Sequence, residues 1–572
     1  MKRLLLALLA VGTALGATAQ TNKFDIHVPQ NLKVPNRAPA SIKAAVEARE
    51  AEEAAGSKYG HTDRALFDYA ATITPEDLEA HLSFLASDEL EGRETAERGQ
   101  KIAGRYLASQ FQKFGLQPGN QGSWFQPFEL IKVMVRSVEV TFDGKNMLKA
   151  GTDFAYFNKA ALAEAFEAPL AFGGYGIADP KYNNFSGQDL EGKAVIMLSG
   201  EPQSGSEKYV ISGDAEESKW GEDYRTKVKA AQERGAKAVI MVLGDEAYQK
   251  VSGNPWVRHR MNGYSLRLKY EVDEAGGGIT TIFVPERVVD PLLKKSKKSS
   301  GEWREALNGS AEVPALDFRK YTFGLRPDAD RAVVTGENVL GFLEGTDKKD
   351  EIIVLTAHYD HLGVKDGEVY NGADDDGTGV ATILEMAEAF AMAAKAGIRP
   401  RRSILFMPVS GEEKGLLGSQ YYTDHPVYPL ENTVCNLNID MIGRLDKAHA
   451  DNENYVYIIG SDKLSTDLHR VNEAANKKLT RLELDYTFNA PDDPNRFYYR
   501  SDHYNFAKNN VPVIFYFTGV HEDYHKATDT IEKILFGKTA RIARLVFATA
   551  WEVANREKRL VVDVKNDFPS GR

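Results

Sequence analysis

The chain has 572 residues, which at about 150 residues per domain allows three or four domains. Hydrophobic residues make up 42% and charged residues 27%, and the mean hydropathy of -0.39 excludes a polytopic membrane protein. The formal net charge is -11, without a long run of Lys or Arg. Nucleic acid is therefore not an expected partner, because phosphate binding needs a concentrated basic surface. The single cysteine, Cys435, excludes an intramolecular disulfide.

The first residues of the chain have the pattern of a targeting segment. Lys2 and Arg3 form a charged start, residues 4–15 are apolar, and residues 17–19 read Ala-Thr-Ala, a cleavage signal of the A-x-A type. We expect residues 1–19 to be a signal peptide and the mature chain to be exported, to the periplasm or to the medium. The cysteine lies far from this segment, so we expect no membrane anchor.

Changes in composition along the chain indicate a main domain that is interrupted by an insertion. Residues 20–71 are polar and contain several prolines, which is typical of a linker or arm. Between 165 and 310, short strands are separated by glycines, and no potential metal ligands are grouped. We therefore expect a first part of the main domain at 72–164, an inserted accessory domain of β-rich α/β type at 165–310, and the rest of the main domain at 311–572.

The first expected elements are two helices and several short strands. Thr74 is a good N-cap before Pro75, and Asp77 stands three residues after the cap, so a helix should begin at Pro75. The further predictions in chain order are a helix over 99–114, which Gly115 ends, a strand over 137–142, a strand over 194–198, a helix over 224–234 and a strand over 238–242.

After residue 325 the pattern alternates between apolar strands and helices. This alternation predicts an α/β domain with a mostly parallel central sheet and helices on both faces. Ligands of such sheets bind at the carboxyl ends of the strands, so we expect the chemistry there. The predicted strands are 352–357, 404–409, 434–441 and 511–517, and the predicted helices are 378–395 and 415–424.

Polar residues follow each of these four strands. Taken singly, an adjacent Glu pair is usually a solvated surface feature, an acidic triplet a turn, and a lone histidine structural. Together they place two histidines and several carboxylates on one edge of one sheet, where buried charge requires a compensating cation. The stretches are His358 to His361, Asp374 to Asp376, Glu412 with Glu413, Asp440, and His521 to Asp529.

The residue types at these positions narrow the choice of cation. Imidazole and carboxylate without thiolate suit zinc first, with manganese or cobalt as substitutes, whereas calcium takes oxygen ligands. Two such ions about 3.5–4 Å apart, bridged by one carboxylate, would polarise a carbonyl and activate water. If the chain is extended at Glu412 and Glu413, one of them can bind metal while the other acts as general base. Asp360, two residues after His358, is placed to orient that imidazole.

Six motifs of the chain resemble those of one known family, the co-catalytic di-zinc aminopeptidases of metallopeptidase family 28. The motifs follow the family's order with similar gaps, and the resemblance covers residues 325–572 strongly. Residues 74–130 match as well, through LASDELEGRETAERGQKIAGRYLASQF. The six motifs are AHYDHLG at 357–363, YNGADDDGTG at 370–379, SGEEKGLLGS at 410–419, NLNIDMIGR at 436–444, RSDHYNF at 500–506 and DYHKATDT at 523–530.

The resemblance implies a zinc peptidase with two zinc ions. Glu412 would be the general base that takes a proton from a bridging water and passes it to the leaving amine. The peptide bond between Asp375 and Asp376 would be cis. The ligands would be His358 and Asp440 for one zinc ion, Glu413 and His525 for the other, and Asp375 for both.

The resemblance further implies an aminopeptidase acting on peptides with a free N-terminus, and identifies the insertion at 165–310 as a protease-associated domain. Four residues would support the ligands from a second layer or contact substrate. They are Asp360, Asp376, Asp502 and His503, with His521 as an additional candidate for such a role.

Other functions on the same fold stay open at this stage. Glutaminyl cyclases use one zinc ion, and carboxypeptidases need a basic group for the substrate carboxylate, which Arg500 or Arg444 could supply. A non-catalytic zinc-containing binding protein would be expected to lack ligands or the base, whereas this chain has all of them. Candidates for an apolar substrate pocket, with core packing as an equal alternative, are Tyr498, Tyr499, Tyr504 and Phe506.

Overall fold

The structure is a computed structural model that describes residues 61–565. Its gaps are 145–146, 158–161, 163, 206–207, 255–260, 262, 275–277, 295–296, 315, 317 and 319–320. The predicted signal peptide and most of the predicted arm lie outside the described residues. Within the described part, no helix is long and apolar enough to cross a bilayer.

The described chain forms two compact units. Residues 129–334 form the inserted unit, and residues 61–128 together with 335–565 form the main unit. The chain leaves the main unit within β2 (Phe125–Thr141) and returns within β14 (Thr322–Val339). The units are therefore divided at other residues than the expected 165 and 310. The physical reason is that β14 pairs with β5 (Phe166–Phe172), which draws the flanking segments into the sheet of the inserted unit.

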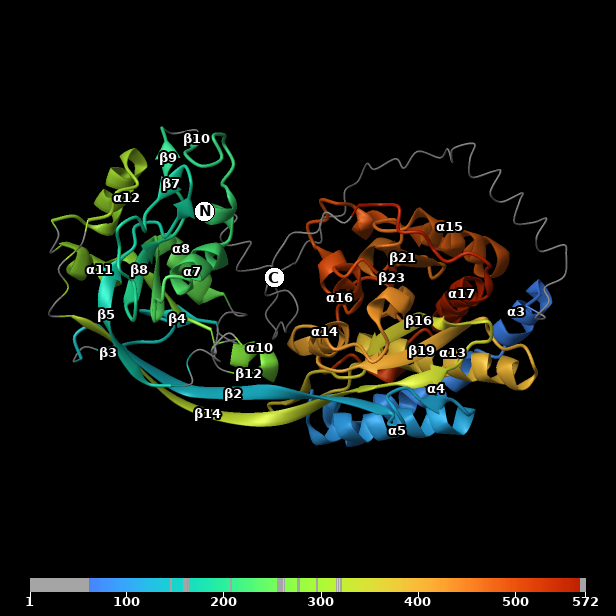
Figure 1. The fold of residues 1–572 in the computed structure, drawn as a ribbon. Helices are drawn as coiled ribbons and strands as arrows, with labels where there is room; N and C mark the ends of the chain where they lie inside the picture. The colour runs from blue at the N-terminus through green and yellow to red at the C-terminus, as the bar shows by residue number, and fades with distance from the viewer. Residues whose placement is uncertain are drawn as a thin grey trace. The chain divides into compact units, whose positions relative to one another are not determined.

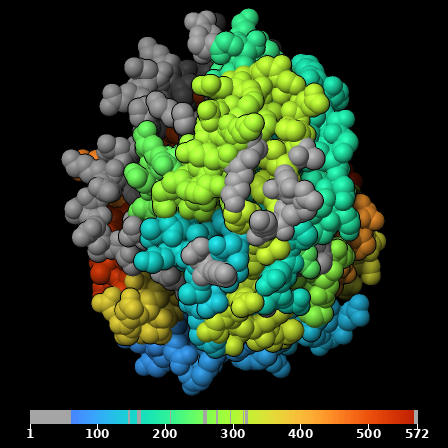
Figure 2. Space-filling model, turned by 90° about the vertical axis from the view of Figure 1, so that its left-hand side faces the viewer, coloured from blue at the N-terminus to red at the C-terminus, as the bar shows by residue number. Residues whose placement is uncertain are grey.

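The inserted unit is built on a nine-stranded sheet. Its path is β12 (Tyr264–Leu268), β2, β14, β5, β8 (Ala194–Leu198), β11 (Ala238–Leu243), β13 (Thr280–Pro285) and β4 (Ala155–Tyr156), and β3 (Met147–Leu148) pairs with β2. The strands β5, β8, β11 and β13 run parallel, and all residues of β8 and β11 are buried. In Figure 2, the early teal and late yellow-green segments of this unit lie side by side on one face. Its identification as a protease-associated domain stays a prediction.

Helices of the inserted unit flank this sheet. The predicted helix at 224–234 is α7 (Tyr224–Gln232), which Asp223 caps by accepting from the backbone N–H of Arg225. The remaining helices are α6 (Lys219–Glu222), α8 (Asp245–Gly253), α10 (Lys269–Glu274), α11 (Glu286–Leu293) and α12 (Ser300–Gly309).

The main unit is built on an eight-stranded sheet, in the order β1 (Gln117–Pro118), β15 (Gly341–Leu343), β19 (Arg402–Val409), β16 (Lys348–His358), β20 (Thr433–Ile439), β23 (Val513–Phe517), β21 (Tyr455–Ile459) and β22 (Glu483–Asp485). β16 runs parallel to β19 and β20, and β20 runs parallel to β23. β15 and β21 pair antiparallel with their central neighbours. The prediction of an α/β fold with a mostly parallel centre is confirmed.

Helices of the main unit cover both faces of this sheet (Figure 1). The Thr74 hydroxyl accepts from the backbone N–H of Asp77 at 3.1 Å and begins the first predicted helix, while Gly115 ends the second with φ of 89°. The helices are α3 (Asp63–Ala70), α4 (Pro75–Leu85), α5 (Arg98–Phe114), α13 (Gly379–Lys395), α14 (Leu417–Asp424), α15 (Thr466–Ala475), α16 (His503–Ala507) and α17 (Phe536–Asn555).

Helix α3 lies inside the segment that was expected to be an arm. Ala65, Leu66 and Ala70 of this helix are buried in the same core as α13 and α17. The packed part of the main unit therefore begins before the predicted residue 72. This short helix was not predicted because the segment is polar on average and its apolar face is stabilised by tertiary contacts.

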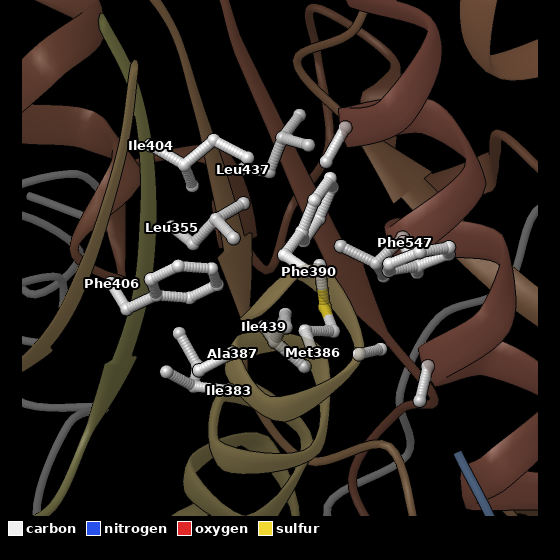
Figure 3. Close-up of a cluster of buried hydrophobic side chains, with 14 of the residues drawn as sticks. Leu355, Ile383, Met386, Ala387, Phe390, Ile404, Phe406, Leu437, Ile439 and Phe547 are labelled. Atoms are coloured by element: carbon white, nitrogen blue, oxygen red, sulfur yellow. The ribbon is translucent and has the colours of Figure 1, made fainter. Parts of the chain in front are cut away.

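Alternate residues of the central strands face two separate apolar cores. On β16, Ile353 and Leu355 pack with α13 and α17, whereas Ile352 and Val354 pack on the opposite face. Figure 3 shows the first core, where Phe390 of α13 lies among strand side chains and α17. Because helices cover both faces of the sheet, a substrate can reach its side chains at the ends of the strands.

Replacing Phe390 by Ala should destabilise the main unit by about 3–5 kcal/mol, because it removes a fully buried ring that contacts Phe406, Phe547 and Trp551. The matched control is Met392→Ala on the same helix, where the side chain is 42% exposed and the change should stay within about 0.5 kcal/mol. Urea unfolding of both variants measures the difference. Equal midpoints would contradict this view of the core.

Candidate metal centre

The carboxyl ends of four strands bring the predicted residues to one edge of the main sheet. β16 ends at His358, and β20 is followed directly by Asp440. β19 is followed by the Glu pair, and β23 by the loop that carries His525. All of these side chains are buried. The structure therefore places at this edge the six residues predicted as ligands and base, which are His358, Asp375, Glu412, Glu413, Asp440 and His525.

Asp375 lies between two imidazoles. Its Oδ1 is 3.1 Å from Nε2 of His358, and its Oδ2 is 3.1 Å from Nε2 of His525. On the His358 side, Oδ1 of Asp440 lies 3.6 Å from the same ring nitrogen, and on the His525 side, Oε2 of Glu413 lies 3.4 Å from that ring nitrogen. One carboxylate thus faces two groups of donors, which is the arrangement of a bridging ligand. The bond from Asp375 to the next residue is cis.

Glu412 and Glu413 diverge, but the reason differs from the expected extended chain. Residues Glu412–Lys414 form one turn of 3-10 helix after Gly411, whose φ is 80°. Oε2 of Glu412 lies 4.0 Å from Nε2 of His358, whereas Glu413 contacts His525 on the other side of the site. The tight turn therefore separates the two carboxylates, and glycine at positive φ allows that turn.

Asp360 supports the site in another way than expected. The backbone carbonyl of Asp360 lies 3.0 Å from Nδ1 of His358 and orients the ring, while the Asp360 carboxylate is 3.9 Å from that nitrogen. The carboxylate instead accepts from the backbone N–H of Glu412 at 3.2 Å and from the Thr95 hydroxyl at 2.6 Å. Asp360 thereby fixes both an imidazole and the turn that carries Glu412.

Asp376 acts through backbone groups rather than through the donors of the site. Its carboxylate accepts from the backbone N–H groups of His358, Gly379 and Met441 at 3.0–3.2 Å. These bonds join the ends of β16 and β20 to the start of α13. They also occupy both oxygens, so Asp376 fits the supporting position that the sequence suggested.

Asp440 is held by a chain of buried hydrogen bonds along the sheet. The Ser501 hydroxyl donates to Oδ2 of Asp440 at 2.7 Å and receives a bond from the amide of Asn438 at 2.8 Å. The Thr356 hydroxyl donates to Oδ1 of the Asn438 side chain at 2.6 Å. With Oδ2 engaged in this way, Oδ1 of Asp440 is left to face His358.

Burial and charge set opposite proton preferences for two carboxylates. Burial by itself would raise the pKa of Asp375, but close contact with His358 and His525 holds that pKa well below its ordinary value. Burial raises the pKa of Glu412 well above its ordinary value, and the nearby Glu413 and Asp440 carboxylates raise it further. Asp375 is therefore suited to bind a cation, and Glu412 to hold and release a proton.

Sequence reasoning did not single out Arg93, which is fully buried beneath the site. It donates to the carbonyls of Tyr359 at 3.0 Å, Asn371 at 2.7 Å and Gly372 at 3.0 Å, and also to that of Leu85. Burial lowers its pKa to about 10 although nearby carboxylates raise it, so the guanidinium stays charged at neutral pH. The available signal was a charged residue directly after Gly92 in the matched stretch LASDELEGRETAERGQKIAGRYLASQF.

His361 was noted in the sequence but given no role, and the structure places it inside the site. Its side chain is fully buried, with Nδ1 2.9 Å from Oε1 of Glu413 and 3.9 Å from Oδ2 of Asp375. Among the described residues, His361, Asp375 and Glu413 form one of the groups that could hold a metal ion. The other group is His358, Asp376 and Asp440.

His521 and Asp529 support the acidic triplet from the loop after β23. The backbone N–H of Asp523 donates to Nδ1 of His521, so Nε2 carries the proton and faces Oδ2 of Asp374 at 3.2 Å. Asp529 accepts from the backbone N–H groups of Asp374 and Asp375 at 3.1–3.2 Å. Asp529 thereby fixes the backbone of Asp375 without using the Asp375 carboxylate, whereas His521 contacts the side chain of Asp374.

Asp502 and His503 lie next to the site rather than in its donor set. Asp502 accepts from the Ser419 hydroxyl, and burial raises its pKa to about 7. The His503 ring stacks on Phe515 with ring centroids 4.8 Å apart, and it is fully buried there. A supporting role of Asp502 through Ser419 agrees with these contacts, and His503 packs behind the wall that Phe515 forms.

A pocket of about 370 Å³, which includes its opening to solvent, lies beside the donors. Arg500 lines this pocket, whereas Arg444 is bound to Asp523 at 3.0 Å and Glu522 at 3.3 Å. The four aromatic candidates from the sequence are not among the lining residues. The lining residues other than the donors are Met441, Phe497, Arg500, Phe515, Phe517, Val520 and Tyr524.

Comparison with known proteins agrees with this geometry. The family described as Peptidase family M28 matches residues 338–550, which include every donor of the site. A probable leucine aminopeptidase of Trichophyton verrucosum is 33% identical over 282 residues, which cover 47% of this chain and 70% of that protein. The chain belongs to peptidase family M28. Aminopeptidase YwaD of Bacillus subtilis is 27% identical over 344 residues, and the match spans 59% of this chain and 61% of that relative's length.

A solved structure of this kind shares the fold. The aminopeptidase from Aneurinibacillus sp. strain AM-1 superposes with a TM-score of 0.52 at 19% identity, covering 89% of this chain and 100% of that chain. At this identity the similarity supports the fold alone, and the M28 assignment rests on the sequence match.

The donor set of the site fits the zinc that the M28 family implies. It offers imidazole nitrogens and carboxylate oxygens without a thiolate. Within the described part of the chain, Oδ2 of Asp375 and both side-chain oxygens of Glu413 are buried and have no hydrogen-bond partner. Buried carboxylate oxygens are costly in that state, and a bound cation removes the cost.

Replacing Arg93 by Met should destabilise the protein by at least about 3 kcal/mol, because several buried carbonyls lose their donor and the acidic site loses a fixed positive charge. The control is Arg98→Met, where an arginine side chain that is 71% exposed pairs with Glu91 and should contribute less than about 1 kcal/mol. Urea unfolding of the zinc-free chain compares the two. A loss of similar size in both variants would show that the buried guanidinium is not needed.

Proposed function

We propose that this M28 chain is an exported zinc aminopeptidase that hydrolyses the N-terminal bond of peptides. The observation that carries the proposal is Asp375, which lies 3.1 Å from an imidazole on each side, next to a separate buried Glu412. A shared carboxylate between two donor groups is what two neighbouring zinc ions require. The printed names of the relatives support aminopeptidase action, and the pattern of residues 1–19 supports export.

The residues divide into two ligand groups and one base. When bound, two zinc ions would polarise the scissile carbonyl and make a water molecule more acidic. His358 and Asp440 would hold one ion, Glu413 and His525 would hold the other, and Asp375 would serve both. The hydrogen bond from Ser501 to Asp440 and the carbonyl of Asp360 on His358 keep these ligands in place.

Glu412 performs the proton transfers in this account. Its carboxylate faces the His358 side of the site at 4.0 Å, and its backbone N–H is fixed by Asp360. From that place it takes a proton from the attacking water and passes it to the nitrogen of the leaving amine. The surroundings that raise its pKa favour the protonated form needed for the second transfer.

The pocket beside the site supports an apolar first residue of the substrate. Met441, Phe497 and Phe517 line it with carbon and sulfur surface. An apolar side chain gains about 25 cal/mol per Å² that it buries there. Arg500 at the same pocket is the one observation that favours the alternative of a carboxypeptidase, because a guanidinium can bind a terminal carboxylate.

One assay separates these activities. The zinc-loaded chain is incubated with a mixed peptide set in free and N-acetylated form, and products are read by mass spectrometry. We expect stepwise loss of N-terminal residues from the free peptides only, fastest for apolar ones. Shortening of both forms from the other end would establish a carboxypeptidase instead. Loss of ammonia from N-terminal glutamine would indicate a cyclase. The absence of any product would refute the proposal that the chain is a peptidase.

Replacing Glu412 by Gln should lower kcat by at least about a hundredfold while two zinc equivalents remain bound, because the base is lost and the ligands are kept. Replacing Asp375 by Ala should instead lose bound zinc, since both ions share this ligand. Glu305→Gln, an exposed position in the inserted unit, is the control and should match the parent chain. Near-normal turnover in the Glu412 variant, or two retained zinc equivalents in the Asp375 variant, would overturn the assigned roles.

A further inference from the structure

We propose that His361 is an additional protein ligand of the zinc ion that Glu413 and His525 hold. The inference rests on the proposed zinc site and adds a third imidazole to it. His361 lies in the loop directly after β16, three residues after His358. Its side chain is fully buried and faces the oxygens of Glu413 and Asp375.

The first reason is that no hydrogen bond to a described residue accounts for the buried imidazole of His361. Among the described residues, neither ring nitrogen has a hydrogen-bond partner. Oε1 of Glu413 is 2.9 Å from Nδ1, a contact that is an ion pair when the imidazole is protonated but that lacks hydrogen-bond geometry. A buried polar group in that state is costly unless something else satisfies it. A cation shared by both atoms would satisfy each of them.

The second reason is that the same atoms on the neighbouring residues are unsatisfied as well. Oδ2 of Asp375 and both side-chain oxygens of Glu413 are buried without a hydrogen-bond partner from any residue that the structure describes. Oδ2 of Asp375 is 3.9 Å from Nδ1 of His361. Unsatisfied atoms of three different residues therefore surround one point. By contrast, the oxygens of Asp376 accept backbone N–H groups, which explains that residue without a metal.

The third reason is distance. Two ligand atoms of a tetrahedral zinc ion with bonds of about 2.0–2.2 Å lie about 3.4 Å apart. The separations among the donors on this side scatter around that value. They are 2.9 Å and 3.9 Å for His361 with Glu413 and Asp375, and 3.4 Å and 3.1 Å for His525 with the same two residues.

The inference predicts that the two zinc positions differ in chemistry. The ion on the His358 side would have one imidazole, whereas the ion on the other side would have two, from His361 and His525. A second neutral nitrogen ligand would occupy a coordination position on that zinc ion that water or a further carboxylate would otherwise take. The ion on the His361 side should therefore be the more tightly held of the two.

Two variants of the full mature chain test this, with zinc as the probe. In His361→Ala the imidazole is removed, and in His361→Asn the new side-chain amide can donate a hydrogen bond to Glu413. We expect both variants to bind one of the two zinc ions at least about tenfold more weakly, measured by competition with a chelator. Zinc X-ray absorption of the parent chain should give three imidazoles per two zinc ions, and two in each variant.

The matched control is His503→Asn, which changes another fully buried imidazole that stacks on Phe515 and lies outside the donor set. This control should retain both zinc affinities. If His361→Asn binds zinc like the parent chain while His361→Ala does not, His361 only orients Glu413 and the inference is wrong. Unchanged zinc binding in both variants also overturns it.

The zinc measurements on the parent chain keep this test separate from the proposed function. If the parent chain binds two zinc ions and releases N-terminal residues, but the zinc affinities of the His361 variants equal those of the parent, the inference is contradicted and the proposed function is not. A parent chain that binds no zinc contradicts both.

Discussion

The crowding of carboxylates at one buried edge of a sheet is the constraint on which the main unit depends. Like charges a few ångströms apart repel strongly where water is excluded, so each carboxylate there needs a donor or a cation. Arg93 supplies one fixed positive charge beneath the loops, and His358 and His525 supply nitrogen on either side of Asp375. Zinc would supply the rest.

The partners of each carboxylate divide the acidic residues into two kinds. Asp360 and Asp376 accept from backbone N–H groups and so tie the strand ends together. Asp375 and Glu413 keep buried oxygens without hydrogen-bond partners and point them toward imidazoles. Oε2 of Glu412 lies 4.0 Å from Nε2 of His358, which agrees with the proton transfer that we propose for this residue. The hydrogen bonds of each carboxylate thus support the division into supporting residues, ligands and base that we propose.

Sequence pattern predicted the parallel core and the gathering of polar residues at one edge of its sheet because both depend on local features, whereas the roles of the six site residues came from the resemblance to a known family. Apolar runs mark buried strands, and strands of a parallel sheet end at one edge. The limits of the inserted unit were not predictable in this way, since they depend on the pairing of β14 with a strand far away in the chain. The sequence did not point to Arg93 because this residue acts through carbonyl groups of a loop that is distant in the chain. It did not point to His361 because only the structure shows that the ring nitrogens lack hydrogen-bond partners among the described residues.

Anomalous diffraction at the zinc edge, from crystals of the zinc-loaded chain, tests the central claim most directly. The account predicts two peaks about 3.5–4 Å apart, one on each side of the Asp375 carboxylate. The first should lie near His358 and Asp440, and the second near Glu413 and His525. A single peak, or peaks away from Asp375, would contradict the claim that paired cations neutralise this edge of the sheet.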